Sequence, residues 1–457
     1  MSDDSGASWR DLPPELMEVM RALFGEAAEE MIERTAEAGI DPAAMFEAVG
    51  LKENPNGVAP LFAHLRRLWQ GTPDGEAVNW DLAHDAARET AAAEGPDRAV
   101  DPRARAQIAE AVKVAELWLD QATELPASAG TPDALSAAEW VETTLPMWKQ
   151  LTTPIAKSMR DAMRGLVAEQ VAADPTLANL AGGASQMIER VAGGMFGLQL
   201  GHALGLLSRE VFGYSDTGLP LARRGAVGLL PDAIDRFAGE IDLPRDEVRL
   251  FLAAREAAHA RLFGRVPWLA DRLMAAVEVY AAGIEIDARH LEEAMRELEP
   301  VTPEALREAL SSGVFTPAPS ERQRQALERL ETALALVEGW VSVVTERALA
   351  RNLPDVASLS EMMRRRRAAG GPAEHALATL VGLELRPRRA RQAGVLWAAI
   401  TDDVGPVERE RLWSHPDMLP SAADLDEPET FWTRRAERAQ AEAALDAEIA
   451  AFFDEQE

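Results

Sequence analysis

Cysteine is absent from the 457 residues of this chain, which excludes disulfide bonds and thiolate metal ligands. Histidine is also scarce, with seven residues, so a metal site would have to combine histidine with aspartate or glutamate. Basic residues (47) are outnumbered by acidic ones (76), and the formal net charge is −29. This charge disfavours nonspecific binding of nucleic acid or anionic lipid, so we expect neither nucleic acid nor a membrane among the partners.

Long hydrophobic runs are lacking as well. The best candidate for a membrane span is Val191–Leu207, but it has only 17 residues and it contains Gln199 and His202. The first six residues are acidic and polar, unlike those of a signal peptide. These features together predict a cytoplasmic protein.

Runs of β-branched residues are scarce, whereas alanine, leucine, glutamate and arginine are abundant. Because these four residues favour helices, the composition predicts a mainly α, multi-helix fold with few or no strands. One short strand is expected within Gly225–Leu230. The hydrophobic content of 47% is that of an ordinary globular protein, with room for two or three sub-domains.

Breaks in the helical patterns divide the chain into parts, and the clearest linker is Pro126–Pro132. We predict a flexible lead (1–12), an N-terminal helical unit (13–125), a larger helical domain (136–415) and an acidic C-terminal tail (416–457). The tail is expected to be helical from about residue 424 onward.

Three glycines, Gly197, Gly201 and Gly205, are spaced four residues apart in an apolar segment. Glycine costs up to ~1 kcal/mol in a helix, so a row of glycines on one face suggests that another helix approaches closely. A phosphate-binding loop is the alternative, but no strand precedes the glycines and no Gly-Lys-Ser follows them. The row therefore predicts a buried, closely packed helix.

The longest helix is expected over Ser320–Leu349, which carries a regular apolar stripe with Glu338 beside it. Beyond this helix, the four consecutive arginines 364–367 are expected to open a loop that ends near Gly370. They could bind an anionic ligand. In a chain this acidic, however, a solvated loop tied to neighbouring carboxylates is favoured.

The central stretch of the chain is predicted to be a helix over 244–264. Pro244 suits its first turn, and Gly264 is expected to form a left-handed C-terminal cap. Inside it lies Arg255-Glu256-Ala257-Ala258-His259, one residue away from His-Glu-x-x-His. In that motif the two histidines hold zinc, and the glutamate takes a proton from the metal-bound water.

Arg255 and His259 lie one turn apart on a mostly apolar stripe, whereas Glu256 points about 100° away. An arginine and a histidine on such a stripe need partners, because unpaired charge is costly to bury. For an isolated match to this pattern, a core histidine with surface charges beside it is the more common outcome. The residues alone therefore leave both interpretations open.

The surrounding sequence resembles a family of mainly actinobacterial proteins labelled as zincin-like, as hydrolases or as zinc-dependent metalloproteases. A related branch is named for an association with deazaflavin cofactor biosynthesis. The resemblance covers nearly the whole chain. It is carried by 252–263 with the Val-Pro-Trp-Leu at 266–269, and by 78–83, 138–146, 197–205 and 336–341.

The resemblance implies that His259 matches the second zinc histidine, Glu256 the general base and Glu338 a third zinc ligand. Arg255 departs from the pattern, because arginine stays protonated and has no lone pair for a metal. We therefore expect no resident cofactor and a non-catalytic binding or scaffold role, with an unknown peptide or small molecule in the former active-site cleft. A guanidinium at this place would supply Glu338 with a positive partner.

Two alternatives remain open. The first is an active zinc-dependent metallopeptidase with an unusual ligand set, in which His202 or His290 supplies the missing ligand and zinc is bound. The second is an accessory protein of a cofactor pathway that holds a small molecule in the former cleft.

Overall fold

The computed structural model describes residues 72, 75–128, 130–173, 178–283, 320–370, 378 and 389–454. It divides into two compact units. The first contains residues up to Ala83, Met159–Gln199 and Glu285–Ala318, and the second contains His84–Ser158, Leu200–Ile284 and Pro319–Glu457. All the residues of the candidate site belong to the second unit.

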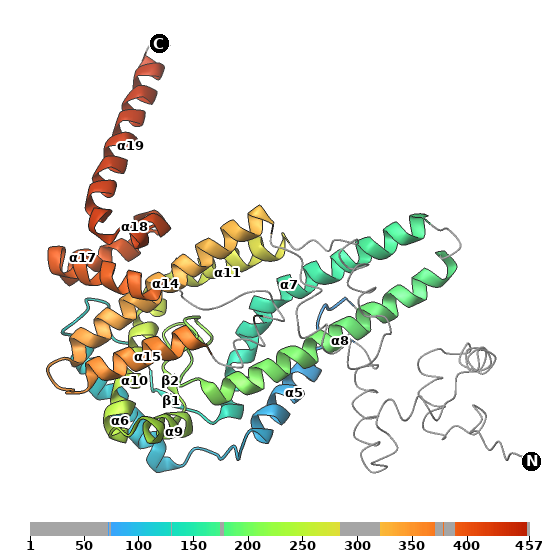
Figure 1. The fold of residues 1–457 in the computed structure, drawn as a ribbon, viewed down its shortest axis with the longest axis horizontal. Coiled ribbons are helices and arrows are strands. Elements are labelled where there is room, and N and C mark those ends of the chain that lie inside the picture. Colours follow the sequence, from blue (N-terminus) through green and yellow to red (C-terminus); the bar gives the residue numbers. More distant parts are fainter. Residues whose placement is uncertain are drawn as a thin grey trace, which may run out of the picture. The chain divides into compact units, whose positions relative to one another are not determined.

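Helices make up nearly all of the regular structure in the described residues, which confirms the predicted mainly α fold (Figure 1). The helices are α5 (Trp80–Ala93), α6 (Pro102–Leu119), α7 (Ala137–Ala173), α8 (Ala178–Glu210), α9 (Pro231–Ile241), α10 (Arg245–Arg265), α11 (Pro267–Ala281), α14 (Glu321–Leu349), α15 (Val356–Ala369), α17 (Ala390–Arg411), α18 (Ala422–Asp426) and α19 (Phe431–Asp454). Short 3-10 turns lie at Leu412–Ser414, Pro416–Met418 and Pro428–Thr430. None of the described helices is long and apolar enough to cross a membrane.

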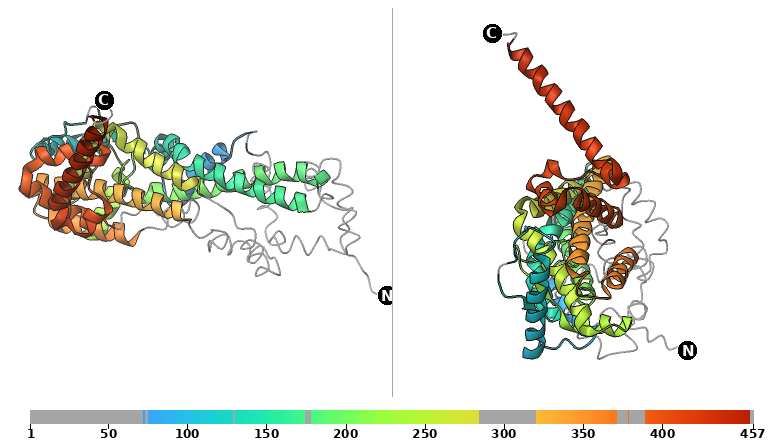
Figure 2. Two further views of the ribbon diagram at one scale, coloured as in Figure 1. Left: turned by 90° about the horizontal axis from the view of Figure 1, so that it is seen from above. Right: turned by 90° about the vertical axis from the view of Figure 1, so that its left-hand side faces the viewer.

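Helix α10 is the centre of the second unit, and its residues from Phe251 to Phe263 are all buried. It packs against α6, α9 and α14, with further contacts to α11, α15 and β2. Helix α14 in turn packs along α11 and α17, and α14 and α17 lie side by side in both figures (Figures 1 and 2). A helix covered on all sides has no solvated face, so each of its charged residues must find a partner inside the protein.

Helix α14 begins where the sequence predicts it. Ser320 is the N-cap, and its hydroxyl accepts from the backbone N–H of Gln323 while the Gln323 side chain accepts from the backbone N–H of Ser320. This reciprocal pair satisfies two backbone donors that a helix start leaves free.

The prediction that this helix is the longest is wrong, because α7 has 37 residues and α14 has 29. Pro146 and Pro154 lie inside α7.

The two strands, β1 (Asp133–Ala134) and β2 (Gly228–Leu229), form a parallel pair next to α10. Strand β2 lies inside the predicted strand segment 225–230. The loop that follows α8 is bound to β2, because the Leu230 N–H donates to the Phe212 carbonyl at 2.9 Å. The Trp140 indole N–H also donates to the Gly213 carbonyl, at 3.0 Å. The sheet therefore fixes the loop 212–216 beside the central helix.

The glycines of α8 are buried inside a helix, as predicted. In the second unit, a methyl group at Gly205 would lie 2.6 Å from the Ala87 carbonyl oxygen of α5. In the first unit, a methyl group at Gly197 would lie 2.4 Å from the Asn79 carbonyl oxygen. Both distances are too short for any side chain, so close backbone approach explains both glycines.

Two local predictions are wrong. Gly264 is not a left-handed cap, because α10 continues to Arg265 and ends at Val266. Gly264 instead packs closely against another backbone, since a methyl group there would lie 3.2 Å from the Gly225 Cα, a tight contact. The four arginines 364–367 do not open a loop but form the last turns of α15.

Other predictions concern residues outside those described by the structure. They are the flexible lead 1–12 and the first part of the N-terminal helical unit, up to residue 71.

Candidate functional site

A buried ion pair joins Arg255 of α10 to Glu338 of α14. The Arg255 Nη2 donates to the Glu338 Oε1, and the Arg255 Nη1 lies 3.5 Å from the Ser342 Oγ. The side chains are 6% and 5% exposed, respectively. Both residues lie on buried stretches of α10 and α14, and these helices pack against each other. Each charge therefore finds its partner across the contact between the helices. The structure thus brings together the two charged residues that the sequence placed around one site.

His259 lies beside this pair. Its Nδ1 is 3.0 Å from the Arg255 backbone carbonyl oxygen. Because a carbonyl oxygen only accepts, Nδ1 carries the hydrogen, and in the neutral ring Nε2 keeps a lone pair. Burial lowers the pKa of His259 and outweighs the opposite effect of Glu338.

The Nε2 lone pair of His259 faces the Glu338 Oε2 at 3.6 Å. Neither atom has a well-directed hydrogen-bond donor in the structure. The Glu338 Oε2 is nevertheless compensated by a cation, because the Arg367 Nη1 lies 3.0 Å away. The His259 Nε2 remains a buried acceptor without a donor, which is costly.

Arg367 of α15 is a member of the site that the sequence analysis did not identify. Its Nη1 lies 3.0 Å from the Glu338 Oε2, and its Nη2 lies 3.5 Å from the Asp216 Oδ1 and donates to the Asp216 backbone carbonyl. The spacing of Leu359, Met363 and Arg367 was the available signal. Steps of four residues put Arg367 on the same helix face as the buried Leu359 and Met363.

Two guanidinium groups therefore contact one buried carboxylate. Burial alone raises the pKa of Glu338, but the attraction of Arg255 and Arg367 is stronger and holds this pKa well below its usual range. Asp216 adds a second negative charge beside Arg367. With a neutral His259, the four charged groups sum to zero, so the buried cluster is balanced without any other ion.

Glu256 points to a different part of the unit. Its carboxylate accepts from the backbone N–H groups of Tyr214 and Ser215, each at 3.1 Å. Burial raises the pKa of Glu256 to about 8, although these hydrogen bonds act in the opposite direction. In the part of the chain that the structure describes, no hydrogen bond or ion pair joins Glu256 to His259 or Glu338. The candidate general base is thus held by the loop before β2.

Of the two alternative ligands, the structure describes only His202, and it is not part of the cluster. His202 is exposed on α8, and its Nδ1 lies 3.2 Å from the Thr90 hydroxyl of α5. His290 lies outside the described residues. The structure thus provides no support for His202 as a metal ligand beside His259.

His259 and Glu338 keep the spacing of two zinc ligands. Two ligands of tetrahedral zinc with bonds of about 2.1 Å lie roughly 3.4 Å apart, close to the separation of the His259 Nε2 and the Glu338 Oε2. A structural or catalytic zinc nevertheless needs at least three protein ligands, and the remaining neighbours here are the guanidinium groups of Arg255 and Arg367. Among the described residues, no group of three or more His, Asp or Glu side chains is placed to hold a metal. The residues that the structure describes around His259 and Glu338 do not fit zinc.

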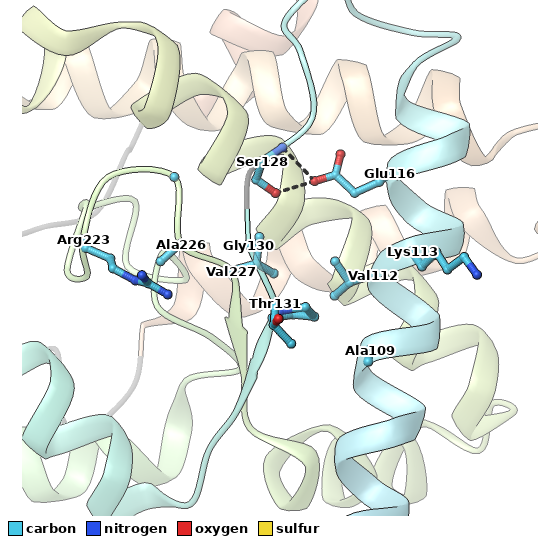
Figure 3. Close-up of a pocket in the computed structure, with 12 residues that line it drawn as sticks. Ala109, Val112, Lys113, Glu116, Ser128, Gly130, Thr131, Arg223, Ala226 and Val227 are labelled. Atoms are coloured by element: carbon cyan, nitrogen blue, oxygen red, sulfur yellow. Dashed lines mark hydrogen bonds between the residues drawn. The ribbon is translucent and has the colours of Figure 1, made fainter.

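A small cavity of about 150 Å³ lies elsewhere in the second unit, between α6, the segment after it and the loop before β2 (Figure 3). Glu116 spans one side of it and accepts from the Ser128 hydroxyl and backbone N–H. The Lys113 side chain extends away from Thr131 and the cavity centre (Figure 3). None of the residues that line this cavity belongs to the Arg255–Glu338 cluster.

Comparisons with known proteins give two matches. The model of a family described as zincin-like metallopeptidase matches residues 78–432. A crystal structure of a candidate hydrolase with a novel fold from Chloroflexus aurantiacus is similar, with a TM-score of 0.55 and 20% sequence identity. The match covers 79% of this chain and 99% of that protein, and at this identity it shows a shared fold alone. No curated protein matches the chain.

Proposed function

Because this chain belongs to the zincin-like metallopeptidase family, we propose that it is a non-catalytic member with a binding or scaffold role. The observation that carries the proposal is the buried Arg255 guanidinium on the carboxylate of Glu338. In a working site of this kind, the carboxylate would face a metal. Here two permanent organic cations, Arg255 and Arg367, contact it instead. The motif Arg255-Glu256-Ala257-Ala258-His259 is then a degenerate zinc motif.

The charge of the cluster supports this proposal. A divalent cation placed between His259 and Glu338 would lie beside two guanidinium groups, and like charges at this distance repel strongly in a buried site. The existing cluster is already neutral, and Glu338 is already compensated. The cluster thus preserves the electrostatics of a metal site while lacking its chemistry.

Metal analysis of the purified protein tests the proposal. The protein should be prepared without chelators, dialysed against metal-free buffer and analysed by inductively coupled plasma mass spectrometry. We expect less than about one tenth of an equivalent of zinc, because two ligands give a weak site. Stoichiometric zinc that survives dialysis and disappears in His259→Ala would contradict the proposal.

A second candidate function, an active zinc-dependent peptidase with an unusual ligand set, is favoured by one observation. The His259 Nε2 and the Glu338 Oε2 are both buried without donors and keep a separation suitable for two zinc ligands. Such an enzyme would need a third ligand from residues such as His290. A peptidase assay with added zinc separates the two functions, with Glu256→Gln as the control. Zinc-dependent turnover that Glu256→Gln abolishes would establish the enzyme.

The ligand of the cluster and the location of the protein are also proposals. We infer a peptide or small molecule as the ligand, because the family name refers to peptide cleavage. We propose a cytoplasmic location from the acidic composition of the chain.

A further inference from the structure

Arg367 and Asp216 lie at the outer side of the cluster. Their side chains are 13% and 15% exposed, whereas those of Glu338 and His259 are 5% and 2% exposed. Arg367 comes from α15, whereas His259 belongs to the central helix and Glu338 to α14. The guanidinium of Arg367 thus lies against the Glu338 Oε2 at the outer side of the cluster.

Arg367 contacts its partners as a bound guanidinium ligand would. It lies between the carboxylates of Glu338 and Asp216 and also donates to the Asp216 backbone carbonyl. Next to it, Gly218 adopts a positive φ of 80°, and a methyl group there would lie 3.8 Å from the Arg367 Nη1. Two carboxylates and a carbonyl around one planar cation form a recognition site for guanidinium chemistry.

The fit of Arg367 is nevertheless incomplete. Its Nε is buried without an acceptor, while the His259 Nε2 and the Glu338 Oε2 are buried without a well-directed donor. The His259 Nε2 is therefore an acceptor without a donor, while the Nε–H of the neighbouring Arg367 has no acceptor. A guanidinium or ammonium group entering from another direction could donate to both acceptors, which Arg367 does not do.

A second arginine fastens the same helix. Arg366 donates to the Glu210 backbone carbonyl, and its guanidinium lies 4.5 Å from the centre of the Phe212 ring. Both contacts are on the segment that leads into the loop containing Asp216. The end of α15 is thus held over the cluster by two adjacent arginines, rather than by apolar packing alone.

We propose that Glu338, Asp216 and His259 form a receptor for an arginine side chain of a peptide, and that Arg367 occupies it as an internal competitor. Displacement of Arg367 would keep the cluster neutral, because one guanidinium replaces another. The contact between α15 and the cluster is then autoinhibitory. This inference rests on the proposed function, because it requires a cluster without metal.

The first test removes the competitor. Arg367→Ala removes the cation that contacts both Glu338 and Asp216, so the cluster lacks one positive charge. Ethylguanidinium at millimolar concentration should raise the Tm of Arg367→Ala but not that of the wild type. Tetramethylammonium, a cation without N–H groups, should not raise it. Arg365→Ala is the matched control, because Arg365 is exposed and pairs with Glu361 on its own helix.

The second test uses a peptide. A fluorescent peptide with a single central arginine should bind Arg367→Ala roughly tenfold or more tightly than the wild type, the effect of gaining a charged hydrogen bond. Replacing the arginine by norleucine, or introducing Asp216→Asn in addition to Arg367→Ala, should remove this gain. Stabilisation by ethylguanidinium without peptide binding would show a site for a small guanidinium compound and would overturn the peptide assignment.

A third variant covers the case in which Arg367→Ala does not fold. Arg367→Lys keeps a positive charge but lacks the planar fork, so it should compete less and bind the peptide more tightly than the wild type. If folded Arg367→Ala or Arg367→Lys shows no gain for either probe, the receptor inference is wrong. Zinc analysis of the same samples separates this failure from that of the proposed function. Zinc-free samples that show no gain would overturn the receptor alone, whereas stoichiometric zinc in the wild type would overturn the proposed function and the receptor with it.

Discussion

Arg255 and Arg261 lie on the same buried helix, six residues apart, yet their surroundings differ. Arg261 donates to the Glu116 side chain at 2.6 Å, to the Asp120 carboxylate at 2.7 Å, and to the backbone carbonyls of Leu125 and Glu116 at 2.9 and 2.8 Å. No atom of its side chain lacks a partner. Beside Arg255, in contrast, the His259 Nε2 has no donor, and the Glu338 Oε2 has an ion pair with Arg367 but no well-directed hydrogen bond.

This difference separates a structural charge from a candidate site. A fully bonded buried arginine fastens helices, and the Arg261 bonds fasten α10 to α6 and to the segment that follows it. In a cluster with an unbonded acceptor, the free-energy cost of desolvation is not fully offset by hydrogen bonds. A ligand that donates to this acceptor would recover part of the cost. The same residue type on the same helix therefore serves two purposes, and hydrogen-bond satisfaction distinguishes them.

The largest effect is expected for Glu338→Ala. This change leaves the buried Arg255 without a carboxylate, and loss of one partner of a buried pair costs ~3–5 kcal/mol. Urea unfolding followed by circular dichroism measures it. A loss below about 1 kcal/mol would show that Arg255 finds another partner and that the cluster is not a tightly coupled unit.

A smaller loss of ~2–3 kcal/mol is expected for Arg261→Ala, because charged hydrogen bonds disappear while their acceptors keep other partners. Glu116 retains Ser128, and the Asp120 side chain is 57% exposed and can be hydrated. Arg261→Ala should not change the binding of ethylguanidinium in the Arg367→Ala background. Such a change would break the distinction between the two arginines.

The pH dependence of stability should report on Glu256. Its pKa is raised by burial from 4.5 to about 8, so its stabilising contribution is complete below pH 4.5 and is lost as the pH rises toward 8. Relative to Glu256→Gln, the wild type should lose up to ~1.4 kcal/mol per pH unit in this window. Unfolding curves at several pH values measure the difference. A difference that is constant, or that grows with pH, would show that the N–H groups of Tyr214 and Ser215 keep Glu256 ionised.

The smallest effect is expected for Arg265→Ala in the last turn of the same helix. Arg265 is exposed, and changes at such positions usually stay within about 0.5 kcal/mol. Urea unfolding of this variant supplies the reference for the buried arginines. A loss comparable to that of Arg261→Ala would mean that charge on α10, rather than burial and bonding, determines the cost.

The sequence was sufficient to predict the mainly α fold and the central helix. Helix propensity, the capping residue Ser320 and the apolar stripes are local features, and local features determine helices. The need of Arg255 for a partner also followed from its position, because a charge on a buried stripe must be compensated. The resemblance to the family supplied the choice of partner.

Other parts of the site depend on tertiary contacts that no local pattern shows. Gly264 has the spacing of a helix cap, but its backbone contact with Gly225 decides its role. Arg367 belongs to a run of four arginines, and only the docking of α15 separates it from the exposed Arg365. Glu256 binds the backbone at 214–215 because β2 holds this loop beside α10. The sequence predicted a strand within 225–230 but not the segments that β2 contacts.

The most direct measurement of the central claim is the zinc affinity of Arg255→His compared with that of the wild type, by titration against a competing chelator. The variant restores two histidines one turn apart beside Glu338, whereas the wild type offers two ligands and two guanidinium groups. We predict that the variant binds zinc at least roughly tenfold more tightly, since a third ligand completes the minimal set. Equal affinity, with zinc already held tightly by the wild type, would contradict the account.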